Sequence, residues 1–284
     1  MKLLCFGEVL WDIINGVPHI GGAPFNVAAH SSRLGIETWL VSAVGDDKLG
    51  RRALEEISRY GIHTEYVNTI KGAATGTVQV LLSKDGQPSY DITENAAWDN
   101  ISLEKAQLQS IVDSKFDLFL YGTLSQRSKL SRKSLAEIRN SLTNILSCCD
   151  INIRQNFWSR EIIIDSINGT KLLKLNRDEY KMISRELFDI ELSPLAFGEK
   201  ISSAFGTEII VITLGADGVM IFHNGKIFKV PGIAVKVIDT VGAGDAFCAA
   251  FLNGILSGKS PLEAAENGNK LGAYVASRHG AVPD

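Results

Sequence analysis

The feature that most constrains the fold is the alternation of short apolar runs with longer amphipathic segments along the chain. Short runs rich in Val, Ile, Leu and Phe predict strands, and apolar residues spaced three and four apart predict helices. The predicted strands cover residues 3–7, 38–44, 116–121, 148–152, 171–175 and 208–214. The last of these runs is continuously apolar, which is typical of a strand buried on both faces. The pattern predicts an α/β fold with a mostly parallel sheet covered by helices.

Three helices are predicted from capping residues and apolar spacing. Asp46 and Asp47 are suitable N-caps for a helix that ends near Gly61. Residues 130–146 and 262–276 show the same spacing of apolar side chains. No repeat, low-complexity tract or long linker divides the chain, so we expect a single large domain.

One segment breaks the alternation of strands and helices. Residues 77–83 and 89–93 are strand-like and flank the turn Asp85-Gly86, a dipeptide typical of tight hairpins. We expect this hairpin and residues 13–19 to form a small lid sheet over the carboxyl ends of the parallel strands, where such folds bind ligands. The alternative is an edge extension of the main sheet.

Charge and composition exclude some classes of partner. The 284 residues include 29 basic and 32 acidic residues, with a formal net charge of −3, so there is no electrostatic basis for binding nucleic acid. No apolar run approaches the ~18 residues of a membrane span, so we expect no membrane partner. Basic side chains gather at Arg127, Lys129, Arg132 and Lys133. They predict a solvated helix face, with a phosphate-facing role as the alternative.

The cysteines and the start of the chain indicate a cytoplasmic protein. Cys5, Cys148, Cys149 and Cys248 have no metal-type spacing and are expected to be buried thiols of a reduced compartment. The first apolar run is interrupted by Glu8 and is too short for a signal peptide.

A glycine-rich segment, Asp239 to Asp245, precedes a strongly apolar helix-like stretch. Gly242 and Gly244 flank Ala243 and let the backbone bend tightly, so that successive N–H groups converge at a helix N-terminus, which suits a phosphate. Asp245 would repel such an anion unless it accepts the proton of an attacking hydroxyl during phosphoryl transfer. The alternative is a simple turn with an acidic residue in the first helical turn.

A second motif, Gly21-Gly22-Ala23-Pro24-Phe25-Asn26-Val27-Ala28-Ala29 followed by Leu34-Gly35, lies near the start of the chain. Together with 239–245 it resembles the paired signatures of the ribokinase-like (PfkB) carbohydrate kinases, and the resemblance covers nearly the whole chain. It implies one kinase domain over residues 1–284 with a three-layer α/β/α fold and a β lid from about residues 12–20 and 75–98. It also implies transfer of a phosphoryl group from ATP to a sugar hydroxyl.

The resemblance implies a role for each motif residue. Asp245 would be the catalytic base, and the N–H groups of Gly242, Ala243 and Gly244 would form the anion hole. The residues implied at the sugar are Asp12, Gly21, Gly22, Asn26, Asn152 and Arg154. Those implied at the nucleotide are Asn176, Glu179, Thr213, Gly215, Gly218 and Asn269. Asn176 and Glu179 would also organise Mg²⁺, which prefers oxygen ligands and commonly keeps its waters.

Simpler structural roles fit several of these residues. Asn176 is a good helix cap, residues 213–219 fit a hairpin turn, and Asn269 fits an ordinary exposed helix position. The resemblance further implies loops that hold a monovalent cation such as K⁺, mainly through carbonyl oxygens. The residues implied there are Asp239, Val241, Val275, Arg278 and Gly280.

The sugar is indicated by conflicting motifs. Residues 150–154, Asp-Ile-Asn-Ile-Arg, with Trp158 beyond them, resemble both fructokinases and 2-keto-3-deoxygluconate kinases, and Arg154 would suit a sugar acid. The motifs at 7–12, 21–26 and 121–124 resemble fructokinases. We therefore expect D-fructose to be phosphorylated to fructose 6-phosphate. The alternatives are 2-keto-3-deoxygluconate, ribose or a nucleoside as substrate, and a non-catalytic sugar-sensing protein on the same fold.

Aromatic residues and the lid leave further alternatives open. Ile151 replaces the proline usual in the family, and Trp98 would either close over the sugar or anchor the lid in the core. Trp11 and Tyr90 fit either sugar contacts or packing. Family members often form homodimers through the lid. The apolar residues Val78, Val80 and Leu82 would supply such a surface or pack internally.

Overall fold

The computed structural model describes residues 1–14, 16–82, 88–143 and 145–284. The predicted turn at Asp85-Gly86 lies outside the described residues.

The main sheet has nine strands within the described residues, in the order β13-β12-β11-β10-β9-β8-β1-β4-β5. All neighbouring pairs are parallel except those made by β12 and β13. The strands are β1 (Lys2–Phe6), β4 (Glu37–Gly45), β5 (Val67–Ile70), β8 (Leu118–Gly122), β9 (Leu146–Asp150), β10 (Leu172–Asn176), β11 (Ile209–Thr213), β12 (Val219–His223) and β13 (Lys226–Val230). The predicted mostly parallel sheet is confirmed.

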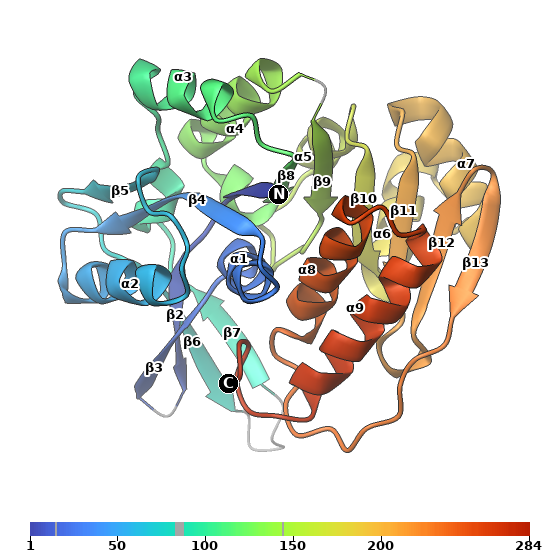
Figure 1. Ribbon diagram of the computed structural model, residues 1–284. Coiled ribbons are helices and arrows are strands. Elements are labelled where there is room, and N and C mark those ends of the chain that lie inside the picture. Colours follow the sequence, from blue (N-terminus) through green and yellow to red (C-terminus); the bar gives the residue numbers. More distant parts are fainter. Residues whose placement is uncertain (15, 83–87, 144) are drawn as a thin grey trace.

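Helices cover both faces of this sheet (Figure 1). Alternate residues of β1 separate two cores, since Leu3 and Cys5 belong to one and Leu4 and Phe6 to the other. The first core packs under α1 (Ala23–Arg33), α2 (Lys48–Arg59), α8 (Ala243–Leu256) and α9 (Pro261–Ala276). The second packs under α3 (Lys105–Asp113), α4 (Lys129–Ser141), α5 (Arg160–Ile167), α6 (Arg177–Phe188) and α7 (Pro194–Phe205). The fold is therefore the expected three-layer α/β/α arrangement.

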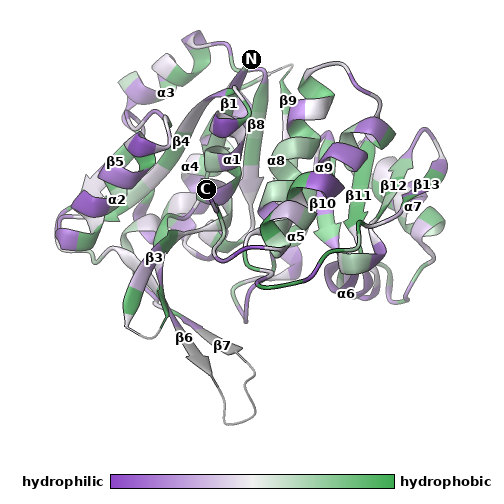
Figure 2. Cartoon of the chain, turned by 60° about the horizontal axis from the view of Figure 1, so that its bottom comes forward, coloured by the Kyte–Doolittle hydropathy of each residue, from purple (hydrophilic) through white to green (hydrophobic). Residues whose placement is uncertain are grey.

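A second sheet of four strands forms the lid, in the order β3-β2-β6-β7. Its strands are β2 (Leu10–Ile14), β3 (Val17–Gly21), β6 (Gly76–Leu82) and β7 (Pro88–Ile92). Figure 2 shows this sheet extending away from the layers of the main domain, and β2 lies between β3 and β6. The expected separate sheet is confirmed, and the alternative of an edge extension is wrong.

The predicted boundaries differ from the structure at several elements, and two of these differences have a clear physical reason. The helix expected over 130–146 ends at Ser141, because Asn140, Ser141 and Thr143 are weak helix formers, and Leu146 instead pairs with Leu118 in the sheet. The strand expected to reach residue 152 ends at Asp150, since Asn152 has a φ of 48°, which no strand accommodates.

The predicted helix cap at Asp47 and the predicted burial of the cysteines are confirmed. The Asp47 carboxylate caps α2 by accepting a hydrogen bond from the Gly50 N–H at 2.7 Å. All four cysteines are buried and free. Among the described residues, no helix combines the length and apolar character needed to cross a bilayer.

Candidate active site

The carboxyl ends of the parallel strands open into a cavity of about 550 Å³ bordered by the lid. The lid contributes the apolar side chains of Leu10, Ile14, Val78 and Ile92. Twelve of the predicted site residues line this cavity: Asp12, Gly22, Asn26, Asn152, Arg154, Asn176, Glu179, Thr213, Val241, Gly242, Gly244 and Asp245. The motifs near both ends of the chain therefore meet in one place.

Asp245 lies in the first turn of α8 and faces the cavity. Asn26 of α1 donates a hydrogen bond from Nδ2 to Asp245 Oδ2 at 2.8 Å. Burial, and to a lesser extent the nearby Asp150 carboxylate, raises the pKa of Asp245 to about 6, although Asn26 and Lys174 oppose the shift. A carboxylate of this kind is poised to accept a proton near neutral pH.

Asn26 also presents a free acceptor. Its Oδ1 atom is buried and has no hydrogen-bond partner among the described residues. Because a buried amide oxygen without a partner is costly, a ligand hydroxyl would be stabilised there. Asn26 can therefore hold the candidate base with one atom and a substrate hydroxyl with the other.

The backbone around Gly242 forms the candidate anion hole. Gly242 precedes α8 with a φ of 75°, a left-handed conformation that favours glycine. The N–H groups of Gly242 and Gly244 have no partner within the described part of the chain. The third predicted donor, Ala243, instead donates its N–H to the Thr240 carbonyl at 3.2 Å, so the anion hole differs from the prediction at this residue.

Two carboxyl groups lie at the lid end of the cavity. Burial raises the pKa of Asp12 to about 6 and that of Glu8 to about 7, and the positive charge of Arg154 opposes both shifts. The Asp12 carboxylate lies against Gly21, where any side chain would collide with it. A side chain on Gly22 would collide with the Glu8 carbonyl. The two glycines thus let the backbone pass close to both acidic residues.

Lys174 is a cavity residue that the sequence prediction missed, as is Glu8. The Lys174 ammonium contacts both carboxylate oxygens of Asp150 at 2.8 Å, and both side chains are buried. Burial alone would lower the pKa of Lys174, but Asp150 raises it, so this lysine stays charged. Its Nζ lies 3.9 Å from the Cβ position of Gly244. A lone lysine in the apolar run of β10 was the available signal for a buried ion pair.

Asn176 and Glu179 form the cap predicted as the structural alternative. Asn176 Oδ1 accepts from the N–H groups of Asp178 and Glu179, both at 2.9 Å. Glu179 accepts from Asn176 N at 2.7 Å and from Ile153 N at 2.9 Å. Both residues also line the cavity, so the cap places carboxylate and amide oxygens at its edge.

The other residues predicted to bind the nucleotide line the cavity or lie outside it. Thr213 ends β11 and lines the cavity, whereas Gly215 and Gly218 belong to the short turn η3 (Gly215–Asp217) and its end, which joins β11 to the antiparallel β12. This segment therefore has the hairpin geometry given as its structural alternative, and its role at the nucleotide stays a prediction. Asn269 of α9 donates from Nδ2 to the Pro231 carbonyl at 2.8 Å and so joins the helix to the loop before Asp239.

The predicted cation loops are brought together by Asp239. Its carboxylate accepts from Val241 N at 3.0 Å and from Gly280 N at 3.1 Å. The Val275 side chain is fully buried, and its carbonyl accepts from Arg278 N at 2.9 Å. The Arg278 guanidinium stacks on Tyr274. Gly280, Val275 and Arg278 do not line the cavity.

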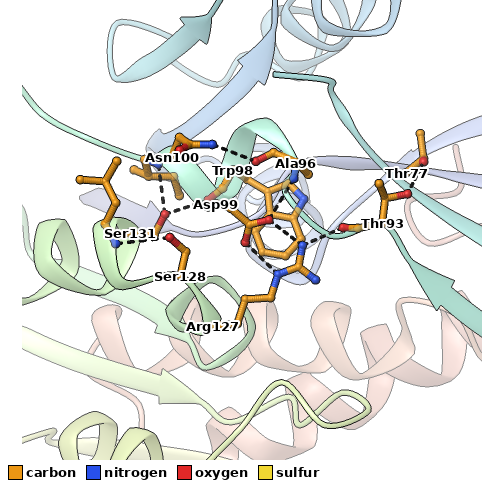
Figure 3. Close-up of polar contacts among 11 residues, drawn as sticks. Thr77, Thr93, Ala96, Trp98, Asp99, Asn100, Arg127, Ser128 and Ser131 are labelled. Atoms are coloured by element: carbon orange, nitrogen blue, oxygen red, sulfur yellow. Dashed lines mark hydrogen bonds and ion pairs between the residues drawn. The ribbon is translucent and has the colours of Figure 1, made fainter. Parts of the chain in front are cut away.

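Trp98 anchors the base of the lid rather than closing over a sugar (Figure 3). It is fully buried in the short helix η1 (Ala97–Asn100). The Arg127 Cζ atom lies 3.9 Å from the centroid of the Trp98 ring and 4.4 Å from that of the Phe157 ring. Arg127 also forms two hydrogen bonds of 2.7 Å with Asp99 and one of 2.7 Å with the Thr93 carbonyl. The prediction of a solvated face is therefore wrong for Arg127.

Of the other two aromatic residues predicted at the sugar or in packing, the structure describes the side chain of Trp11 but not that of Tyr90. Trp11 is 1% exposed and donates from Nε1 to the Leu49 carbonyl at 3.1 Å, so its role is packing. The side chain of Tyr90 lies outside the described part of the structure, as do those of Val80 and Leu82. Val78 is buried against the cavity, which favours internal packing over an outer surface.

Comparison with known proteins identifies the family. The model of the pfkB family of carbohydrate kinases matches residues 3–284. Probable fructokinase-5 of Arabidopsis thaliana is 29% identical over 310 residues, which cover 99% of this chain and 93% of that relative.

Solved structures agree with this assignment. The sugar kinase PH1459 of Pyrococcus horikoshii, solved in complex with ATP, is 26% identical with a TM-score of 0.84, over 99% of this chain and 94% of that one. A fructokinase double mutant from Vibrio cholerae, bound to fructose, ADP and potassium ion, shares the fold at 21% identity and a TM-score of 0.84, with the same coverage. The chain belongs to the pfkB family of carbohydrate kinases.

Proposed function

We propose that the protein transfers the γ-phosphoryl group of ATP to the 6-hydroxyl of D-fructose. The observation that carries this proposal is the single cavity that joins a buried carboxylate at a helix N-terminus, Asp245, to the polar groups of the Gly21–Asn26 loop. A phosphate cradle and a proton acceptor in one place are what phosphoryl transfer to a hydroxyl requires.

Different residues would bind the sugar, accept its proton and stabilise the transferring phosphoryl group. Asp12 and the free Oδ1 of Asn26 would bind sugar hydroxyls, which places the acceptor oxygen beside Asp245. Asp245 then takes the proton of that hydroxyl as the new P–O bond forms and the bond to ADP breaks. The free N–H groups of Gly242 and Gly244 stabilise the charge on the transferring group, and the Lys174 ammonium beside Gly244 adds a positive charge.

The donor atoms suit the implied cations. The Asn176 and Glu179 oxygens already accept backbone N–H bonds, so they would hold Mg²⁺ through its waters, and the ion would neutralise phosphate charge. The Asp239 carboxylate joins the segments at Val241 and Gly280, whose carbonyl oxygens would hold K⁺ with those of Val275 and Arg278. That ion would stiffen the loop behind the anion hole.

Charge balance around Arg154 favours a neutral sugar over a sugar acid. Arg154 lowers the pKa of Glu8, Asp12 and Asp245, so three carboxyl groups of the chain already lie within the electrostatic influence of this guanidinium. A substrate carboxylate would add a fourth acidic group to the same space. Arg154 is nonetheless the residue that would favour 2-keto-3-deoxygluconate, so this sugar acid is the second candidate.

The test is ADP formation from ATP with fructose, ribose, 2-keto-3-deoxygluconate, tagatose and adenosine, each with and without K⁺. We expect fructose to give the highest kcat/KM, and K⁺ to increase it. Activity confined to the sugar acid would overturn the fructose assignment, and activity with adenosine alone would make the protein a nucleoside kinase. Sugar binding without any ADP formation would indicate the sugar-sensing alternative. The homodimer through the lid stays a prediction, which the molar mass in solution would test.

A further inference from the structure

One face of α1 carries three polar side chains at helical spacing, Asn26, His30 and Arg33. Each contacts a segment from the far end of the chain. Asn26 donates to Asp245, His30 contacts the Ala281 carbonyl at 2.9 Å, and Arg33 donates to the Pro283 carbonyl at 2.5 Å. The helix that follows the sugar loop thus holds both the candidate base and the segment after α9.

The contact of His30 is a defined hydrogen bond. His30 is 4% exposed, and a carbonyl oxygen can only accept, so Nε2 carries the proton and donates it to Ala281. Burial lowers the pKa of His30, which agrees with a neutral ring that has one N–H.

Ala281 forms the wall behind the anion hole. A Cβ atom placed on Gly242 would lie 2.5 Å from Ala281 Cα and 2.6 Å from its carbonyl oxygen. The backbones of Gly242 and Ala281 are therefore in direct contact. Because Gly242 is the N-cap of α8, a displacement of Ala281 would change the direction of the N–H groups that face the cavity.

Packing alone does not hold this segment in place. Residues 280–284 border a cavity of about 720 Å³, and residues 283 and 284 also border one of about 450 Å³. Val282 packs against the core under α1, α2, α8 and α9, and hydrogen bonds supply the other contacts, from Gly280 N to Asp239 and from Tyr274 Oη to the Asp284 carbonyl, in addition to those of His30 and Arg33. Only the His30 bond reaches Ala281 from a side chain in the described structure.

We propose that His30 is a positioning residue for the anion hole: through Ala281 it holds Gly242 in the orientation that phosphoryl transfer requires. Through Asn26 and His30, α1 then sets the position of both the base and the anion hole relative to the sugar loop at its own N-terminus. The inference rests on the proposed phosphoryl transfer at this site.

The test compares His30→Leu, which removes the donor, with His30→Gln, which keeps an N–H group. We expect His30→Leu to lower kcat about 10- to 100-fold, because small displacements of transition-state donors are costly. The KM for fructose should change less than about twofold, since Asp12 and Asn26 are untouched, and His30→Gln should recover most of kcat. Hydrogen exchange of residues 240–246 should be faster in His30→Leu and near normal in His30→Gln.

A matched control is Ser134→Ala on α4, which removes a buried hydrogen bond of 2.9 Å to the Ile101 carbonyl in the opposite layer. It should lower thermal stability without changing kcat or the exchange of residues 240–246. The proposal is overturned if His30→Leu keeps wild-type kcat, or if leucine and glutamine variants lose kcat equally. The exchange measurement needs no turnover, so it tests the positioning role even if the wild-type protein phosphorylates none of the sugars.

Discussion

Asp245 places opposite demands on activity and stability. As a base it must be ionised, so kcat/KM should fall as the pH drops below about 6, the pKa that burial gives this carboxyl group. Its unperturbed pKa is 3.8, so between about 4 and 6 the folded chain keeps a proton that the unfolded chain has lost. The contribution of Asp245 to the free energy of unfolding therefore falls as pH rises through that window and changes no further above it.

Asp245→Asn should separate these two demands. We expect turnover to fall on the order of 10²–10⁴-fold, because the proton acceptor is lost. At pH 7.5 the same variant should be more stable by about 1–3 kcal/mol, since no charge has to be buried, and the gain should shrink toward pH 4. Urea denaturation at both pH values, beside steady-state kinetics, checks this. A variant with near-normal turnover would show that Asp245 is not the base.

Lys174 and Asp150 form a pair whose two roles can be separated by substitution. Lys174→Met should leave Asp150 as an uncompensated buried charge and destabilise the fold by about 3–5 kcal/mol. It should also lower kcat about 10²–10³-fold, because the positive charge beside Gly244 is lost.

The double variant Lys174→Met with Asp150→Asn is the control for this pair. It should recover most of the stability, since neither charge remains, yet its kcat should stay low. Recovery of kcat together with stability would mean that Lys174 serves only the fold. Thermal unfolding and kinetics on the same samples distinguish the two results.

The residues found from sequence are those whose function leaves a local pattern. Gly242, Asp245 and Asn26 belong to short motifs, and all three line the cavity as expected. Lys174 and Glu8 were missed because their importance arises from neighbours on other strands, such as Asp150 across the β9–β10 pair. Ala243 lies where it was predicted, but its N–H is not free, because it donates a hydrogen bond to the Thr240 carbonyl.

Among the elements, the lid depends on a small polar cluster at its base. Arg127 joins the end of β7, through the Thr93 carbonyl, to Asp99 and the ring of Trp98 (Figure 3). Thr93 in turn pairs with Thr77 of β6 through their hydroxyl groups at 2.8 Å. Both ends of the β6–β7 hairpin are thereby connected to the main domain at one point.

Arg127→Met should loosen this connection. We expect a loss of about 3–5 kcal/mol of stability from the unpaired Asp99, and an increased KM for the sugar, because Val78 and Ile92 of the lid line the cavity. Arg139→Met on α4 is the matched control, since Arg139 also stacks on an aromatic ring, Tyr121, but does not contact the lid in the described structure. Equal KM values for the two variants would show that the cluster supports the fold alone.

Element boundaries were less predictable than the elements themselves. The hairpin of β6 and β7 follows from alternation and a turn signal, both of which are local. The end of α4 could not be predicted in this way, because the apolar residues of 142–146 continue the helical spacing. Only the pairing of Leu146 with β8 assigns it to the sheet. Trp98 was ambiguous for a similar reason, since it packs in a core built from distant segments and against Arg127.

At the scale of the whole molecule, alternation was enough to predict a parallel sheet and a separate lid. The antiparallel extension by β12 and β13 was not predicted in full, although Asn224-Gly225 between them is a hairpin signal. Strand order has no local signal, because it depends on how the helices cross from one strand to the next.

The contact between Asn26 and Asp245 joins residues that are 219 positions apart in the chain. During synthesis the sugar loop and most of the sheet therefore exist before the helix that carries the base has left the ribosome. Closing so long a loop is entropically costly and slow, so formation of the site should be among the last events of folding. A partly synthesised chain would thus contain the sugar loop but neither the base nor the anion hole, so it could not transfer a phosphoryl group from ATP.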